Sequence, residues 1–281
     1  ADVLLEYGVN TVSLGITVTY LEDGTVYPDD PVLQGLEEDL SELISEYHEN
    51  GIAVMLAPEP MPSGRMGEPS PVPEEARDQF LETMEAEVIR WAEFAESERV
   101  EFFAPLNEPD RKVGEERAIS WSQQVLPGLR EVYTGKVVWK GDLGEFFAGS
   151  PVSGDGGIVG VITGRKLDFS NYDVLGFTVS PSDSNLEQFR SRVKDMIDAL
   201  LEDCEESGVP EAMITEIGVF PHLSLNDQQK VEAHEIVFEE AEADGRVKGV
   251  FVLDQPLDNP NVQPLKDSTA GTSMMEFYTG S

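Results

Sequence analysis

The sequence has few cysteines and histidines, the side chains that form disulfides and most zinc sites. It contains one cysteine, Cys204, and three histidines in 281 residues. One cysteine excludes an intramolecular disulfide, and the scattered histidines do not have the spacing of zinc ligands. We therefore expect no metal centre, and nothing in the sequence calls for a cofactor.

Long apolar runs are also absent. No stretch comes near the roughly 18 apolar residues that a membrane-spanning helix needs, so we expect no such segment in this chain. The chain runs directly into Val3, Leu4 and Leu5 without a basic segment or a cleavage pattern. No signal peptide can therefore be read in this numbering.

Basic residues are scarce. There are 19 Lys and Arg against 55 Asp and Glu, which gives a formal net charge of −36 and a pI near 4.1. Such a surface repels the phosphate backbone of a nucleic acid, so we expect no nucleic-acid partner, whereas a neutral carbohydrate is indifferent to it. The acidic surplus favours solubility and indicates adaptation to high salt, where counterions screen the self-repulsion.

Apolar strands alternate with amphipathic helices along the whole chain. Strands are expected at residues 9–18, 52–58, 100–106, 136–140, 172–180, 212–217 and 247–253. Helices are expected around residues 33–47, 80–95, 118–132, 186–200 and 228–243, and a loop at residues 59–73. Continuous apolar strands separated by amphipathic helices favour a parallel sheet that is covered on both faces.

The regular repeat predicts one domain over residues 1–281 with an α/β fold, a (β/α)8 TIM barrel. Only seven strands are visible, and residues 2–7 read as the end of a helix that runs into Gly8. We expect the first strand to lie upstream of residue 1, between strands 9–18 and 247–253. A seven-stranded or differently closed barrel is the alternative. A doubly wound sheet fits less well, because no glycine-rich phosphate loop follows the first visible strand.

Several expected strands end in or near a carboxylate, at the face where barrels of this kind carry their active sites. These carboxylates are Glu59, Glu108, Asp142, Asp183, Glu216 and Asp254. Because acidic residues are so frequent, position alone is weak evidence. Glu108 and Glu216 are distinguished by their apolar neighbours, because a buried carboxylate is costly unless it is paired or used in chemistry.

Two carboxylates on facing strand ends can cleave a glycosidic bond. One donates a proton to the leaving oxygen, and the other attacks the anomeric carbon. We expect the carboxyl groups of Glu108 and Glu216 to face each other at about 5 to 5.5 Å, the separation found in retaining enzymes.

The segments FFAPLNEP and MITEIGVF resemble the fourth-strand Asn-Glu-Pro motif and the seventh-strand Glu motif of glycoside hydrolase clan A. The resemblance covers most of the chain, and NTVSL and VMLAP are somewhat similar to the family 113 β-mannanases. It implies a barrel that cleaves β-linked sugars with retention, with Glu108 as acid/base and Glu216 as nucleophile. It also implies that Asn107 binds the sugar 2-hydroxyl, and it makes residues 9–18 the second strand of the barrel.

The sequence departs from the clan pattern at three positions. Ser13 stands where many members have Arg, Ser180 where they have Tyr, and Leu253 where they have Trp. In the clan the Tyr touches the nucleophile and the Trp floors the sugar subsite. The departures favour either an outlying family or a barrel that has lost catalysis.

Four more residues are expected to bind substrate. Trp139 offers an aromatic face for a sugar, with packing in the core as the alternative. His222 lies in the loop after strand 212–217, and Glu59 and Asp254 are strand-end carboxylates.

The sequence thus predicts a retaining glycoside hydrolase for β-linked oligo- or polysaccharides, with an extracellular or cell-surface location expected and a cytoplasmic one left open. A non-catalytic carbohydrate-binding or cell-surface scaffold barrel is the alternative. An isomerase or aldolase barrel would need a phosphate loop or a strand-end lysine, for which Lys140 is the only candidate.

Overall fold

The computed structural model describes residues 1–64, 71–142, 168–179, 185–217 and 225–252, together with residues 275 and 279. The chain divides into two compact units. Unit 2 comprises Thr11–Asp142 and Asp168–Val174, and unit 1 comprises Ala1–Asn10, Leu143–Leu167 and Leu175–Ser281. The expectation of a single domain over residues 1–281 stays a prediction.

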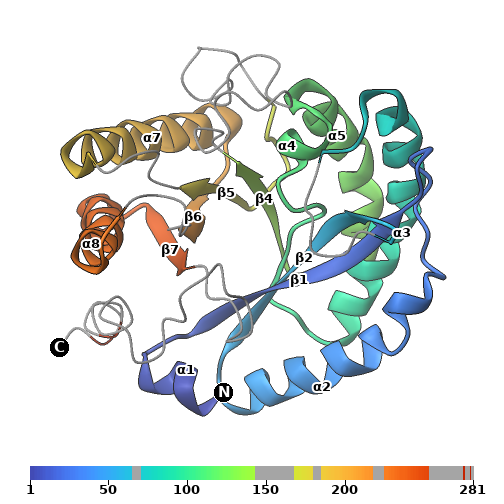
Figure 1. Cartoon of the computed structure of the whole chain (residues 1–281), viewed down its shortest axis with the longest axis horizontal. Coiled ribbons are helices and arrows are strands. Elements are labelled where there is room, and N and C mark those ends of the chain that lie inside the picture. The colour runs from blue at the N-terminus through green and yellow to red at the C-terminus, as the bar shows by residue number, and fades with distance from the viewer. Residues whose placement is uncertain are drawn as a thin grey trace. The chain divides into compact units, whose positions relative to one another are not determined.

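Seven strands of the described residues join in one hydrogen-bonded sheet in chain order, from β1 to β7 (Figure 1). The pairs β1–β2, β2–β3, β3–β4 and β6–β7 are parallel. The strands are β1 Thr11–Tyr20, β2 Ala53–Pro62, β3 Phe102–Phe103, β4 Lys136–Asp142, β5 Val174–Val179, β6 Glu211–Ile217 and β7 Val247–Val252. The predicted alternation of parallel strands and helices is confirmed. With β1 and β7 at the two ends of the order, a strand missing upstream of residue 1 is compatible with this sheet.

The described helices follow the predicted amphipathic segments. They are α1 Asp2–Glu6, α2 Leu36–Glu49, α3 Arg77–Ser97, α4 Pro109–Val113, α5 Glu115–Val132, α7 Leu186–Ser207 and α8 Asp227–Ala243, with short 3-10 helices at Pro31–Leu33 and Glu74–Ala76. Helix α1 confirms the interpretation of residues 2–7, and Gly8 follows it with a φ of 71°, the left-handed state that commonly ends a helix.

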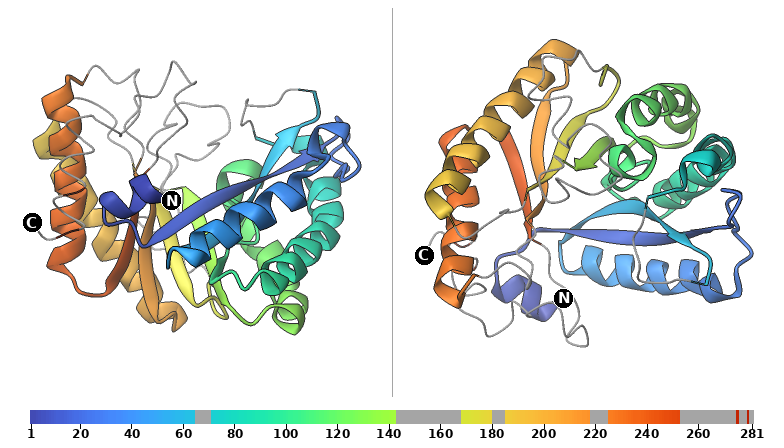
Figure 2. Two further views of the ribbon diagram at one scale, coloured as in Figure 1. Left: turned by 90° about the horizontal axis from the view of Figure 1, so that it is seen from below. Right: turned by 45° about the horizontal axis from the view of Figure 1, so that its top comes forward.

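In unit 2, helices α2, α3 and α5 lie along the strands (Figure 2). The periodic positions of α3 predicted its buried face, and all five are buried: Phe80, Met84, Val88, Trp91 and Ala95. Each large apolar side chain buried in this way stabilises the fold by roughly 1.5–3 kcal/mol. The indole Nε1 of Trp91 donates to Glu87 Oε1 at 2.9 Å, so the polar atom of this buried ring is also satisfied.

Several predicted boundaries were wrong. Strand β2 continues to Pro62, four residues beyond the expected end at Pro58, because it pairs residue by residue with β1 as far as Tyr20. Strand β3 is only Phe102–Phe103, because Pro105 has no N–H to donate to a ladder. The loop expected at residues 59–73 begins after Pro62, where β2 ends. Helix α2 begins at Leu36, whereas the helix was expected from about residue 33.

Carboxylates at the starts of the unit 2 strands are structural. Glu101 Oε2 accepts the backbone N–H of Val54 at 2.8 Å, where β2 begins. Asp173 Oδ2 accepts the N–H of Val137 at 2.7 Å, where β4 begins, and pairs with Arg130 at 2.6 Å. These acidic residues satisfy backbone donors at the strand starts. In a barrel, residues at this face contribute to stability, and residues at the opposite face carry the chemistry.

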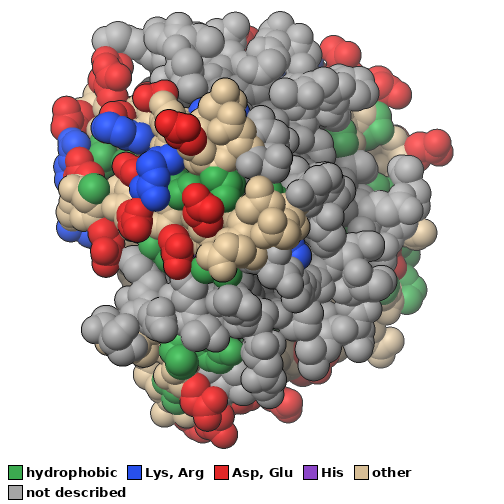
Figure 3. Space-filling view, turned by 60° about the vertical axis from the view of Figure 1, so that its left-hand side comes forward, with side chains coloured by type: hydrophobic (Ala, Val, Ile, Leu, Met, Phe, Trp, Pro, Cys, Tyr) green, Lys and Arg blue, Asp and Glu red, His purple; other side chains and the backbone are tan. Residues whose placement is uncertain are grey.

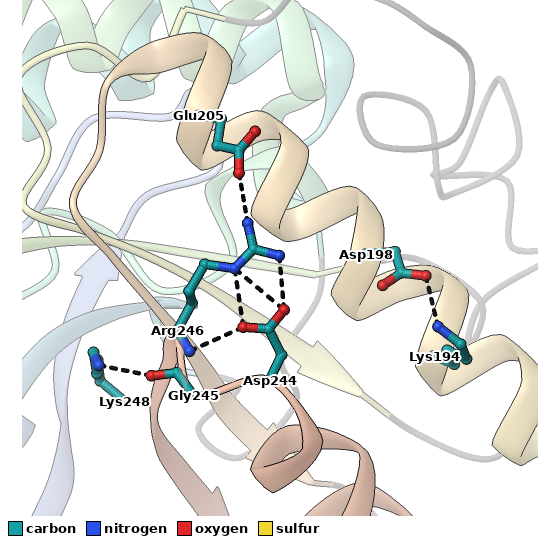
Figure 4. A network of polar contacts seen from close by, with 7 residues as sticks. All are labelled: Lys194, Asp198, Glu205, Asp244, Gly245, Arg246 and Lys248. Carbon is teal, nitrogen blue, oxygen red and sulfur yellow. Dashed lines mark hydrogen bonds and ion pairs between the residues drawn. The ribbon is translucent and has the colours of Figure 1, made fainter.

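In unit 1, helices α7 and α8 present a charged face (Figure 3). Acidic side chains there are interleaved with Arg and Lys, and Figure 4 shows one network that joins the residues after α8 to α7. Arg246 binds Asp244 at 2.7 Å and Glu205 at 2.5 Å. The side-chain and backbone N–H groups of Arg246 lower the pKa of Asp244 to about 2. Because these side chains are exposed to solvent, which screens their charges, the network contributes little to stability.

Candidate active site

The described part of the candidate site lies where the strands of unit 2 end. The backbone N–H of Asn107 donates to Pro58 O at 2.8 Å, and that of Glu108 donates to Lys140 O at 2.8 Å. Asn107 also forms an isolated parallel bridge with Lys140. The Asn-Glu pair is thus fixed between β2 and β4 after β3 itself has ended.

Glu108 has a left-handed backbone, with φ 46° and ψ 55°, and it caps the N-terminus of α4. Pro109 follows it as the first helical residue, with a ring geometry that suits this position. A left-handed state at a residue other than glycine costs roughly 1–3 kcal/mol. Glu108 is only 6% exposed. Glu108 therefore combines a strained backbone with a buried carboxylate, and strained backbones are frequent at functional sites.

Arg111 is one polar partner of Glu108. Its Nη1 lies 2.9 Å from Glu108 Oε2, and one turn of α4 separates the two residues. The Arg111 side chain is 23% exposed and that of Glu108 is 7% exposed. A guanidinium this close stabilises the ionised carboxylate over the protonated acid.

Glu59, in β2, joins the site through two contacts. Its Oε1 accepts from Lys112 Nζ at 2.5 Å, and its Oε2 accepts from Asn107 Nδ2. The Lys112 side chain is 1% exposed and that of Glu59 is 16% exposed. The structure therefore brings together Glu59, Asn107 and Glu108, three of the residues predicted from the sequence.

Trp139, in β4, packs against other aromatic rings. It is 2% exposed and lies 5.2 Å from the ring of Phe169 and 5.8 Å from that of Tyr172. These are the contacts of a packing residue. Sugar stacking by Trp139 stays a prediction that its described contacts do not support.

Glu216 lies in β6 of unit 1 and is partly buried, between the buried residues Thr215 and Ile217. A Cβ added to Gly176 in β5 would lie 2.2 Å from Thr215 Cγ2, so only glycine permits this close approach of the neighbouring strand. Glu216 is thus held on a tightly packed strand. Its separation from Glu108 of unit 2 stays a prediction.

Several solved glycosidases have the same fold as this chain. A GH113 β-1,4-mannanase matches with a TM-score of 0.69 and 16% identity, over 99% of this chain and 90% of that one. The GH113 β-mannanase of Alicyclobacillus acidocaldarius matches with a TM-score of 0.70 and 14% identity over the same shares. The chain has the barrel fold of these glycosidases.

A β-glucuronidase from an uncultured Clostridium sp. has a related fold, with a TM-score of 0.62 and 13% identity over 100% of this chain but only 46% of its own. No protein-family model and no curated protein sequence matches the chain. The shared barrel fold confirms the predicted TIM-barrel class. At these identities the likeness concerns the fold alone.

Arg111 and Lys112 are residues of the candidate site that the sequence reasoning missed. A signal was present, because two of only 19 basic residues lie within three residues of the end of the Asn-Glu-Pro motif. Lys140, the strand-end lysine, is 4% exposed and pairs with Asn107 through its backbone.

Other predicted residues cannot be placed in the barrel. His222, Asp254, Asp183, Ser180 and Leu253, and the side chain of Asp142, lie outside the described residues. Ser13 is exposed in β1. Within the described ranges, no group of three or more His, Cys, Asp or Glu could hold a metal ion, and no helix is long and apolar enough to cross a membrane.

Proposed function

We propose that the protein is a retaining β-glycosidase with Glu108 as acid/base and Glu216 as nucleophile. The observation that carries this proposal is Glu108 itself, a buried carboxylate on a strained backbone beside Asn107 at the strand ends of the barrel. A buried ion pair adds little net stability, so a purely structural pair would not explain the strained backbone and the burial of Glu108.

The proposed reaction proceeds in two displacements. Glu216 attacks the anomeric carbon while Glu108 donates a proton to the departing glycosidic oxygen, so the C–O bond to the leaving group breaks as a glycosyl ester forms. Glu108 then takes a proton from water, which attacks the same carbon, releases Glu216 and retains the configuration. Asn107 binds the 2-hydroxyl, where contacts strengthen in the transition state.

We infer β-mannan or a related neutral β-linked glycan as the first substrate to test. The GH113 structures of the same fold are described as β-mannanases, and an acidic protein does not repel a neutral polysaccharide. Action on such a polymer fits an extracellular or cell-surface location and a high-salt habitat, and both belong to the proposal.

Sugar binding without cleavage is the second candidate. The ion pair between Arg111 and Glu108 favours this function, because a guanidinium at 2.9 Å opposes the protonated carboxyl that proton donation needs. In an active enzyme, substrate binding must weaken that pair before Glu108 can donate a proton in the glycosylation step.

The test is release of reducing ends from β-mannan, β-glucan, β-xylan and β-galactan at low and at molar salt. We expect cleavage by the unmodified protein, and a loss of roughly 10⁴-fold or more in Glu216→Ala. Glu93→Ala, which removes an exposed carboxylate of α3, should keep full activity. An unmodified protein that binds these glycans but releases no reducing ends would support the second candidate.

A further inference from the structure

Lys112 is a fully buried lysine on a helix of five residues, α4. A buried ammonium is costly, and replacing a buried ion pair by apolar residues is often neutral or stabilising. Lys112 nevertheless faces Glu59, with Nζ 2.5 Å from Oε1. Because stability alone does not favour keeping such a pair, its effect on a neighbouring group is the next question.

We propose that Glu59 and Lys112 form a positioning pair that orients the side-chain amide of Asn107, an inference that rests on the glycosidase function proposed above. The second oxygen of Glu59 accepts from Asn107 Nδ2. Together with the N–H of Asn107 on Pro58 O at 2.8 Å, this contact fixes both the backbone and the amide of Asn107 to β2.

The charges of the pair decide which atom of the amide faces the substrate. An ammonium can only donate hydrogen bonds, and an ionised carboxylate can only accept them. Lys112 donates to one oxygen of Glu59, and the other oxygen accepts from the amide nitrogen of Asn107, so the Oδ1 atom of Asn107 turns away from Glu59. Asn107 is then set to accept a hydrogen bond, and the sugar 2-hydroxyl must be the donor. Glu59 thus acts through Asn107 and not as a direct sugar ligand.

The kinetic experiment compares a 4-nitrophenyl β-glycoside that the unmodified protein hydrolyses with its 2-deoxy analogue. Lys112→Met leaves Glu59 without its cation and risks misfolding, so the main variant is the double substitution Lys112→Met with Glu59→Gln. A neutral glutamine can either accept from Asn107 Nδ2 or donate to Asn107 Oδ1, so the Asn107 amide is no longer fixed in one orientation. We expect kcat/KM to fall by about 10²-fold on the 2-hydroxy substrate and hardly at all on the 2-deoxy analogue.

Lys194→Met is the matched control, because this exposed lysine forms a pair with Asp198 at 3.0 Å on α7 (Figure 4). It should leave both substrates unaffected. An equal loss of activity on both substrates in the double variant, or no loss on either, would overturn the positioning role.

A second measurement does not depend on activity. The side-chain amide signals of Asn107 in a ¹H–¹⁵N spectrum are assigned by their absence in Asn107→Asp. In the unmodified protein we expect one amide proton shifted by the charged acceptor, and this shift should disappear in the double variant. Unchanged amide signals would refute the inference. If the unmodified protein cleaves no glycoside, the proposed function fails, and these signals still decide whether the pair orients Asn107.

Discussion

At the scale of single residues, Glu108 combines three features that a structural carboxylate does not need. It is one of three non-glycine residues with a positive φ in the described part of the chain, it is buried, and it caps a helix of five residues. Arg111 compensates the buried charge. The free-energy cost of the left-handed backbone is offset by the contacts of the surrounding fold.

The backbone of Glu108 gives a stability prediction that is independent of catalysis. Glu108→Gly should be more stable than Glu108→Ala by about 1–2 kcal/mol, because only glycine adopts the left-handed state without steric cost. At Glu59, in the extended strand β2, the order should reverse, with alanine better by about 0.5–1 kcal/mol. Urea unfolding of the four variants measures both differences. Alanine being the more stable at both positions would show that Glu108 carries no backbone strain.

The residues of the site differ in how far the sequence could predict them. Glu108 was identified because a carboxylate that ends an apolar run is a local signal, and Asn107 because the Asn-Glu-Pro motif resembles that of clan A. Arg111 and Lys112 were missed, because their contacts depend on the left-handed turn at Glu108, which redirects the chain into α4. That backbone state is imposed by the surrounding structure, and no propensity of glutamate predicts it.

At the scale of the elements, α8 depends on a buried histidine. His234 is 4% exposed, its Nδ1 lies 2.8 Å from Lys230 O, and its ring lies 6.4 Å from that of Phe238. His234 is thus a packing residue. Burial lowers the pKa of His234 below 6.5, so the folded protein resists its protonation.

This shift makes α8 sensitive to mild acid. The folded pKa is depressed, so the contribution of neutral His234 is fully present above pH 6.5 and is lost as the pH falls toward the folded pKa. We expect His234→Gln to reduce the loss of unfolding free energy between pH 7.5 and 5.5 by roughly 1 kcal/mol. Urea midpoints at both pH values measure it, and those at pH 7.5 and 8.5 serve as the control interval. An identical loss in the variant would contradict a buried neutral histidine.

The strands and helices were largely predictable, and their ends were not. Apolar runs and 3.6-residue periodicity are local properties, so the seven strands and the buried face of α3 could be read directly. The end of β2 is set by a partner: Glu59 pairs with Thr17, and the ladder continues to Pro62. Such a boundary depends on non-local hydrogen bonds, which composition does not contain.

At the scale of the whole molecule, the net charge of −36 is the property with the widest physical effect. Like charges on one surface destabilise the folded state, and salt screens them, with a Debye length that falls from about 10 Å at 0.1 M to about 3 Å at 1 M. The mixed acidic and basic side chains of α7 and α8 relieve only part of this repulsion (Figure 3).

We therefore expect the melting temperature to rise by several degrees between 0.1 and 2 M KCl, since each kcal/mol corresponds to roughly 2–4 °C for a chain of this size. Sucrose, which carries no charge, is the control for general solvent effects and should not reproduce the early part of the rise. A melting temperature that falls or stays constant with KCl would contradict adaptation to high salt.

The central claim is the division of labour between Glu108 and Glu216, and the configuration of the product formed with azide tests it most directly. With Glu216→Ala, azide should replace the missing nucleophile and give the inverted α-glycosyl azide. With Glu108→Ala, an aryl glycoside with a good leaving group should still glycosylate Glu216, and azide should then give the retained β-glycosyl azide. Proton NMR of the anomeric position distinguishes the two products. The opposite pattern would show that the roles are exchanged, and no azide product from either variant, with no hydrolysis by the unmodified protein, would contradict the glycosidase.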